Sequence, residues 1–368
     1  MRNKLLAIVV VVAIMGLCGC QSNEIPNILS PTEKNEATEA PVPTSTVIQE
    51  TEETNTPEAT VTNVPTNTLT PTPTSLPETD ASVFEYYIND DDEVIITGLK
   101  DETLSLYVIP QKIEGRQVKG IKDYAFDGCW RKPENDVPTT APSGPWDSDS
   151  NDIAITPIPT LTPIPLPTSV TIVLPAGLTS IGECAFRQCT AITSIEFSDS
   201  LTNIGTSAFT SCTGLTSIVF PEGLEHIGCG NFTNCTGLTD IVFPKNLKSI
   251  DDYAFEGCKA LTNIEFPESL ISIGEEAFSR CSSLTSVILP KNLTDLGDRT
   301  FYSSGLKSIK FSEGTVKIEG NATFSYCYNL NSIEFPNSLI SIGDGVFCEC
   351  TGLTSIVLPE NLVSILNI

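Results

Sequence analysis

A 23-residue repeat constrains this chain more than any other feature of its sequence. Phenylalanine recurs at that spacing through the C-terminal half, and cysteine follows three positions after most of these residues. A unit this short cannot bury its apolar face alone, so successive units must stack around one continuous core. The ladder residues are Phe186, Phe209, Phe232, Phe255, Phe278, Phe301, Phe324 and Phe347, with Cys189, Cys212, Cys235, Cys258, Cys281, Cys327 and Cys350.

The consensus unit reads L-x-x-I-x-F/L-P-x-x-L-x-x-I-G-x-x-A-F-x-x-C-x-x. In one copy, Leu215 and Ile218 alternate as in a short buried strand, and Pro221 ends the strand because proline lacks a ladder donor. Leu224 begins a second inward-facing pair, and the segment through Phe232 returns along the opposite side, as a helical turn or a plain turn. The fold class predicted is an α/β repeat solenoid of 23-residue units, with short parallel strands and short helical or turn segments.

The ladder cysteines are expected to be reduced and buried. A regular stack orients equivalent side chains in parallel, which is unfavourable for disulfide geometry, and a buried thiol behaves as a small apolar group. Export would nevertheless permit disulfides, and the better candidates lie off the ladder at Cys184, Cys229 and Cys348. No C-x-x-C pair is present, so no metal site is predicted.

The N-terminus has the pattern of an export signal. Arg2 and Lys4 precede an apolar run from residue 5 to residue 17, which at ~1.5 Å per residue is too short to span a bilayer core as a helix. The sequence from Leu17 to Cys20 resembles the lipobox of bacterial lipoproteins. The resemblance implies a signal peptide at 1–19, lipid on Cys20, and membrane attachment through that lipid at the bacterial cell surface.

Residues 20–82 are predicted to form a disordered spacer. Positions 31–80 contain eight Pro and fifteen Thr, and no aromatic residue occurs between Gln21 and Val83. Such a segment cannot bury enough apolar surface to offset the entropy lost on ordering. The folded part is therefore expected to begin near Val83, with an opening unit at 83–129.

An insertion at 130–168 separates this opening unit from the main solenoid at 169–368. It is rich in proline and contains both tryptophans of the chain, Trp130 and Trp146. A long Pro-rich loop or hinge is one interpretation. The alternative is a recognition loop, because exposed tryptophan is a frequent binding anchor.

The sixth repeat departs from the consensus. The segment beginning at Phe301 is one residue short and lacks its cysteine, and the segment ending at Phe324 is one residue long. Ordinary drift in a tolerant repeat explains this. The functional alternative is a contact surface for a protein or polysaccharide, formed by Arg299, Tyr302, Lys307, Lys310, Tyr326 and Tyr328, with Lys317 nearby.

Charge and composition exclude several functions. The formal net charge is −26, which disfavours nucleic-acid partners because phosphate binding needs clustered Lys and Arg. His226 is the single histidine, and no catalytic residue set, phosphate-binding loop or cofactor motif is recognisable, so no enzymatic activity is predicted. The sequence stops within a repeat at Ile368, which leaves open a second role, in which this end stacks on a partner of the cell envelope.

The repeat resembles the BspA-like, or Treponema pallidum-type, leucine-rich repeat. The similarity is dense over 169–368, and it extends to 84–129 through Val108-Ile-Pro110 and the segment from Gly120 to Cys129. It implies a leucine-rich repeat solenoid on a bacterial surface protein, some relatives being similar to adhesins. The function expected is therefore a cell-surface binding module for an extracellular protein or polysaccharide.

Overall fold

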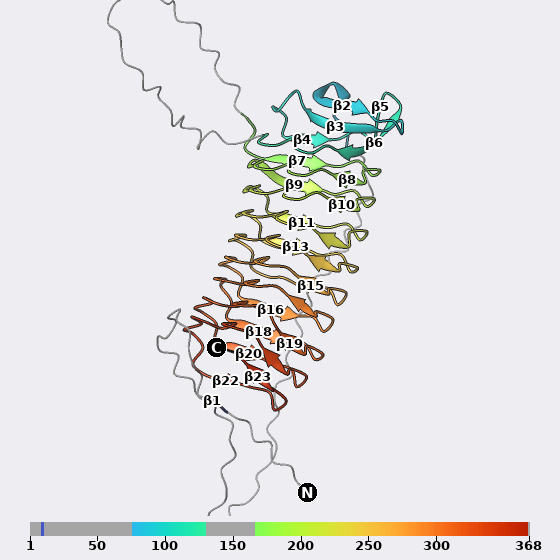
Figure 1. The fold of residues 1–368 in the computed structure, drawn as a ribbon. Coiled ribbons are helices and arrows are strands. Elements are labelled where there is room, and N and C mark those ends of the chain that lie inside the picture. The colour runs from blue at the N-terminus through green and yellow to red at the C-terminus, as the bar shows by residue number, and fades with distance from the viewer. Residues whose placement is uncertain (1–8, 11–75, 130–165, 367–368) are drawn as a thin grey trace, which may run out of the picture. The chain divides into compact units, whose positions relative to one another are not determined.

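The computed structural model describes residues 9–10, 76–129 and 166–366 of the chain. Residues 76–129 and 166–366 form a solenoid of about ten turns (Figure 1), which confirms the predicted fold class. Each regular turn has three segments: a strand of a first row, a two-residue strand of a second row, and a returning turn segment. Trp130, Trp146, Cys20 and most of the predicted spacer lie outside the described residues.

The first row carries the strands predicted around Leu215 and its equivalents. The strands that pair with one another in this row do so in parallel, in three separate ladders, and Ser217, Ile218 and Val219 align with Asp240, Ile241 and Val242 one turn later. The central residue of each triplet is buried and its neighbours are exposed, as alternation along a strand requires. The row comprises β4 (Leu106–Val108), β7 (Val170–Val173), β9 (Ile192–Glu196), β11 (Ser217–Val219), β13 (Asp240–Val242), β16 (Ser286–Leu289), β18 (Ser308–Phe311), β20 (Ser332–Glu334) and β22 (Ile356–Val357).

The second row consists of two-residue strands whose isoleucine or leucine points inward. It follows the longer opening strands β2 (Phe84–Ile88), β3 (Val94–Leu99) and β6 (Arg116–Ile121), of which β2 and β3 are antiparallel. In the described residues its ladder is interrupted after β10 and again after β17. The row continues through β8 (Ser180–Ile181), β10 (Asn203–Ile204), β12 (His226–Ile227), β14 (Ser249–Ile250), β15 (Ser272–Ile273), β17 (Asp295–Leu296), β19 (Lys317–Ile318), β21 (Ser341–Ile342) and β23 (Ser364–Ile365).

Three shorter elements complete the described secondary structure. A 3-10 turn at Ala81–Val83 leads into β2, and β5 (Lys112–Ile113) pairs antiparallel with β6. Backbone described at β1 (Val9–Val10) pairs antiparallel with β22. In the described chain the returning segments are hydrogen-bonded turns rather than helices, so the turn alternative of the prediction is the one found.

The returning segments form one side of the solenoid, which we call the turn side. Successive segments of this side are joined by backbone hydrogen bonds that all run in the same direction along the solenoid. In each turn, three alternate N–H groups donate to carbonyls of the following turn; those of Cys184, Phe186 and Gln188, for example, donate to Thr206, Ala208 and Thr210 at 2.7–2.9 Å. Two residues per turn adopt positive φ to make this possible, such as Cys184 at 51° and Gln188 at 61°. Gly230 and Gly257 occupy these rows without the strain that a side chain brings.

Phenylalanine rings form the centre of the core. The eight ladder rings from Phe186 to Phe347 are fully buried and stack with nearly parallel planes, with centroids 5.1–5.6 Å apart, which is the spacing of offset stacking. Rings from the first row meet several of them edge-on, as Phe220 meets Phe232 at 5.6 Å and 75°. These are the two geometries that the charge distribution of aromatic rings favours, so the regular ladder predicted from the sequence is confirmed.

The ladder cysteines are buried free thiols, as predicted. Each Sγ donates to the carbonyl of the ladder phenylalanine one turn earlier, as Cys212 does to Phe186 at 3.0 Å and Cys235 to Phe209 at 3.1 Å. Burial raises the pKa of Cys235 and Cys281 to about 12. Of the disulfide candidates, Cys184 is a buried free thiol, Cys229 an exposed one, and Cys348 is half-buried.

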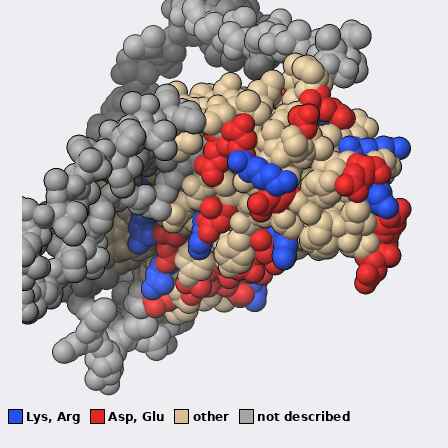
Figure 2. All heavy atoms as spheres, turned by 90° about the horizontal axis from the view of Figure 1, so that it is seen from above, with Lys and Arg blue, Asp and Glu red and all other residues tan. Residues whose placement is uncertain are grey.

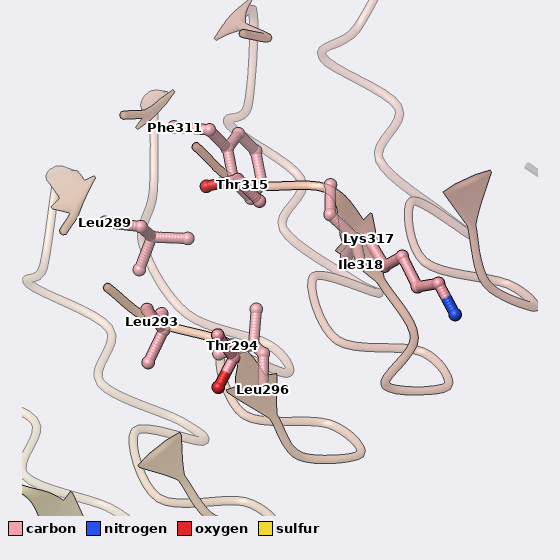
Figure 3. A pocket seen from close by; sticks show the side chains of 8 residues that line it. All are labelled: Leu289, Leu293, Thr294, Leu296, Phe311, Thr315, Lys317 and Ile318. Carbon is pink, nitrogen blue, oxygen red and sulfur yellow. The ribbon is translucent and has the colours of Figure 1, made fainter. Parts of the chain in front are cut away.

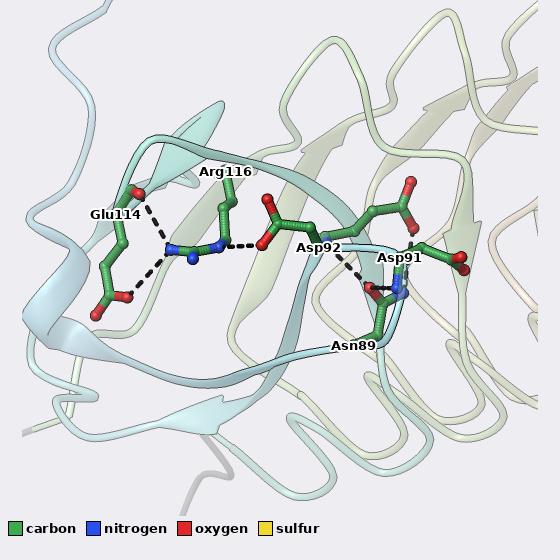
Figure 4. A network of polar contacts seen from close by, with 6 residues as sticks. Asn89, Asp91, Asp92, Glu114 and Arg116 are labelled. Carbon is green, nitrogen blue, oxygen red and sulfur yellow. Dashed lines mark hydrogen bonds and ion pairs between the residues drawn. The ribbon is translucent and has the colours of Figure 1, made fainter.

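The opening strands form a cap with its own polar network (Figure 4). In the β2–β3 hairpin, the Asn89 side chain accepts hydrogen bonds from the backbone N–H groups of Asp91 and Glu93. Arg116 of β6 donates to Asp92 at 2.5 Å and lies near Glu114. These contacts close the hairpin onto β6, and the described fold begins slightly before Val83, because the Thr79 backbone N–H donates to Val108.

Candidate functional site

The sixth turn carries the largest local departure from the regular stack. Ser308 of β18 aligns with Ser286 on one side and with Ser332 on the other, at spacings of 22 and 24 residues rather than 23. The missing cysteine is replaced by buried Ser304, whose Oγ lies 3.2 Å from Cys327 Sγ. As predicted, the short and the long segment cancel, so the later register is preserved.

Three tyrosines of the predicted patch come together on the turn side. Tyr302 and Tyr326 come from successive turns with ring centroids 5.1 Å apart, and Tyr328 meets Tyr326 edge-on at 6.0 Å. Tyr328 is 53% exposed, while the other two rings are half-buried. We call Tyr302, Tyr326 and Tyr328 the tyrosine cluster.

The backbone beneath the tyrosine cluster is fixed by the ladder bonds of the turn side. The Arg280 N–H donates to the Tyr302 carbonyl at 2.8 Å, and the Tyr326 N–H donates to Cys348 at 2.9 Å. Tyr326 occupies one of the positive-φ positions, at 62°. The cluster is therefore a rigid aromatic surface, which loses little conformational entropy when it contacts a partner.

The cations of the predicted patch are spread over different segments. Arg299 lies on the turn side, 3.8 Å and 3.9 Å from the carboxylates of Glu275 and Glu276. Lys310 projects from β18 and pairs with Glu334 on β20 at 2.9 Å, and exposed Lys307 immediately precedes β18. The structure thus brings the tyrosines together but places the lysines on the first strand row, the adjoining side of the solenoid.

The surface that faces the end with the opening strands carries charges of both signs. Seen from the end with the opening strands, Lys and Arg lie next to Asp and Glu (Figure 2). Some of the acidic side chains help to hold the fold together. Asp252 and Asp298 each accept a hydrogen bond from the backbone N–H of the equivalent residue one turn later, at 2.7 Å. Exposed His226 pairs with Ser249 at 2.9 Å. No cluster able to hold a metal ion occurs among the described residues, and none of their helices is long and apolar enough to cross a membrane.

A small opening lined by both apolar and polar side chains, which we call the notch, lies where the second row is interrupted between β17 and β19. Its walls are Leu289, Leu293 and Leu296 from one turn and Phe311, Thr315 and Ile318 from the next (Figure 3), and its empty volume is ≈240 Å³ including its open mouth. The sequence carries a signal for the notch, because Thr315 stands where the neighbouring turns have leucine.

Comparisons with known proteins agree with this architecture. A family model described as the BspA type leucine-rich repeat region matches residues 168–264 and 248–367. Similar solved structures include a leucine-rich repeat protein of T. pallidum (24% identity, 75% of this chain and 91% of that one, TM-score 0.36). Others are a leucine-rich cell surface protein of Faecalibacterium prausnitzii (22%, 79% and 85%, 0.42) and the pneumococcal vaccine antigen PcpA (20%, 77% and 75%, 0.45). No curated protein matches.

Proposed function

Because the chain belongs to the BspA-type leucine-rich repeat family, we propose that it is a cell-surface binding module for an extracellular protein or polysaccharide. The observation that carries the proposal is the tyrosine cluster. Tyrosine combines a large apolar ring with a hydroxyl, and rigid exposed tyrosines are frequent energetic centres of binding surfaces. Within the cluster, the Tyr326 ring contacts Tyr302 of the preceding turn and Tyr328 of its own turn.

The family itself supports a binding role over catalysis. Leucine-rich repeat proteins act as scaffolds whose stacked turns present an extended surface to a partner. The ionisable side chains near the cluster on the turn side form ordinary ion pairs, such as Arg299 with Glu275. The partner class that best suits tyrosines flanked by mixed charges is an extracellular macromolecule.

Truncating the tyrosine cluster should abolish most of the affinity for such a partner. The full chain is first screened against immobilised extracellular-matrix proteins and purified cell-wall polysaccharides. For the macromolecule that binds, Tyr326→Ala together with Tyr328→Ala is expected to weaken binding by about 2 kcal/mol or more, roughly thirtyfold, as for buried aromatic anchors. Surface plasmon resonance measures the change.

Two controls accompany this experiment. Tyr253→Ala removes a half-buried tyrosine from a positive-φ position on the same side, three turns before Tyr326, and should leave binding unchanged. Lys307→Ala with Lys310→Ala tests whether the lysines on the first strand row belong to the site. Full binding by the Tyr326/Tyr328 variant would contradict the assignment of the site to the cluster.

We further propose that the module is held at the cell surface through lipid on Cys20. The support is the sequence Leu17-Cys18-Gly19-Cys20 after a charged and then apolar N-terminus. Two or more acyl chains attach a protein stably to a membrane, at ~0.8 kcal/mol per buried methylene. Cys20→Ser is expected to move the protein from the detergent phase to the aqueous phase on Triton X-114 partition, and to abolish labelling by radioactive palmitate. Unchanged partition and labelling would refute the anchor.

A further inference from the structure

We propose that the tyrosine cluster binds the proline- and threonine-rich residues 59–77 of a second copy of this chain, so that neighbouring copies become linked to one another. We call residues 59–77 the proline segment. The inference rests on the proposed function in one respect, namely that the tyrosine cluster is a binding surface. It adds to that function a ligand that the chain itself supplies.

The three rings of the tyrosine cluster form a faceted surface rather than a flat one. The planes of Tyr302 and Tyr326 are tilted by 53° with their centroids 5.1 Å apart, and the ring of Tyr328 stands at 82° to that of Tyr326. A sugar ring stacks on one flat aromatic face, whereas proline-rich segments dock against several aromatic rings that line a surface together. The shape of the cluster therefore favours a proline-rich protein segment over a polysaccharide.

The chain contains a segment with the required chemistry. The proline segment holds Pro65, Pro71, Pro73 and Pro77, and residues 70–74 alternate threonine with proline. Sequences of this kind favour the polyproline II conformation, which has no internal hydrogen bonds and leaves its carbonyls available to donors such as tyrosine hydroxyls. Because that conformation is already extended before binding, little conformational entropy is lost when the segment meets a rigid aromatic surface.

Charge distinguishes the proline segment and the cluster from the rest of the chain. Copies with a formal net charge of −26 repel one another, so a contact between them is favoured where neither surface is acidic. The proline segment contains no Asp, Glu, Lys or Arg, and residues 320–333, which include Tyr326 and Tyr328, contain none either. Arg299, one turn earlier, lies 3.8 Å and 3.9 Å from carboxylates of its own copy. A neutral surface thus meets a neutral segment.

The length of the chain indicates that the segment comes from another copy. The proline segment is followed by Glu78, whose Oε1 accepts the Gln111 backbone N–H at 3.0 Å in the opening unit. Seven residues separate Pro71 from Glu78 and span at most about 25 Å. From Phe126 of the opening unit to Phe301 beside the cluster, the ladder takes six steps of 4.9–5.5 Å, about 30 Å in all. Residues 70–74 therefore do not reach the cluster of their own copy.

Two synthetic peptides test the proposal with the full chain. The probe is residues 62–77 with acetyl and amide ends, and the matched peptide has alanine in place of its four prolines. Saturation-transfer NMR is expected to show the strongest transfer to the prolyl rings, and the alanine peptide should bind about tenfold more weakly, because it loses both the rings and the extended conformation. Equal binding of the two peptides would overturn the proposal.

Variants of the cluster locate the binding. Tyr328→Ala removes a ring that is 53% exposed, so the protein should fold normally by circular dichroism while binding the probe about tenfold more weakly. Tyr326→Phe with Tyr328→Phe keeps the rings and should retain most of the binding. Tyr253→Ala, on the same side and three turns before Tyr326, is the matched control and should change nothing. Full binding of the probe by Tyr328→Ala would contradict the assignment.

Mixing two variants tests whether the ligand comes from a second copy. A chain with Tyr326→Ala and Tyr328→Ala keeps its proline segment, and a chain with Pro65→Ala, Pro71→Ala and Pro73→Ala keeps its cluster. In sedimentation velocity each variant alone should remain monomeric, whereas their mixture should form a heterodimer and wild type should associate further as its concentration rises. A mixture that stays monomeric where wild type associates would overturn the contact between copies.

The insertion provides a second proline-rich sequence and therefore a control for the choice of segment. Residues 156–167 contain five prolines, but the insertion is tied at both ends to its own copy, by Cys129 in the opening unit and by β7. The proline segment joins the solenoid only at its C-terminal end, which favours it as the segment that extends to a neighbour. A chain with alanine at those five prolines should associate like wild type, and loss of association there would overturn the choice.

The outcomes separate this inference from the function on which it rests. No binding of the probe by wild type, together with loss of macromolecular binding in the Tyr326/Tyr328 variant, overturns the inference and retains the surface module. Probe binding that is lost in Tyr328→Ala, while the macromolecule still binds the Tyr326/Tyr328 variant, supports the inference and overturns the assignment of the macromolecule to the cluster.

Discussion

Phe232→Ala should be among the most destabilising single changes in the solenoid, lowering the free energy of unfolding by about 3–5 kcal/mol. Phe232 is fully buried and stacks on Phe209 at 5.3 Å and on Phe255 at 5.4 Å. Its removal takes away two stacked contacts and one edge-on contact at once, and the ladder bonds of the turn side prevent the neighbours from collapsing into the gap. Chemical denaturation followed by circular dichroism measures the loss.

The matched control is the same substitution at a phenylalanine that is only partly buried. Phe266→Ala removes a ring that packs against the edge of the core, so its cost should be clearly smaller. In a stack where each turn contacts only its neighbours, local damage can also split the transition into two. Denaturation of the Phe232→Ala protein at the wild-type midpoint would show that the ladder is not the source of stability.

Alkaline pH should unfold the protein through its buried thiols. Cys235 and Cys281 have their pKa raised to about 12 by burial, against an ordinary value of 9.0. The folded state therefore keeps these protons in a range where the unfolded state releases them. Their stabilisation is complete below pH 9 and is lost between pH 9 and about 12, at about 1.4 kcal/mol per pH unit for each thiol.

A cysteine variant isolates this effect from the titration of lysine and tyrosine. Cys235→Ser retains a side chain of the kind that Ser304 supplies naturally in the ladder. Above pH 9, the difference in unfolding free energy between wild type and this variant should change by about 1.4 kcal/mol per pH unit, in favour of the variant. A difference that stays constant from pH 8 to pH 11 would mean that the thiol is not the group that titrates.

The regular part of this fold was predictable because its buried positions recur with a fixed spacing in the sequence. One burial pattern repeated every 23 residues identifies the inward positions, the strand that ends before Pro221, and the phenylalanine and cysteine ladders. The returning segments were harder, because the sequence permits a helical turn at Phe232. The structure has plain turns, since two residues per turn adopt positive φ and direct alternate N–H groups to the next turn.

The candidate site was only partly predictable, because it lies where the period fails. The contact between Tyr302 and Tyr326 follows from the near-equivalent positions of the two residues in successive turns. The position of Lys310 on the exposed face of its strand follows as well, because Leu306, Ile309 and Phe311 keep the spacing of the buried strand positions. The notch depends on both the lost ladder between β17 and β19 and the volume missing at Thr315, and only the second of these is visible in the sequence.

Because the backbone hydrogen bonds of the turn side all run in the same direction, they give that side a net dipole as well as holding it together. Every N–H in the three columns points toward the following turn, from Tyr124 to Tyr326, so the peptide dipoles add along the solenoid axis as they do in an α-helix. Each added turn lengthens the columns without reversing any member. The turn side therefore has a fixed polarity, with the positive ends of its peptide dipoles toward the later turns.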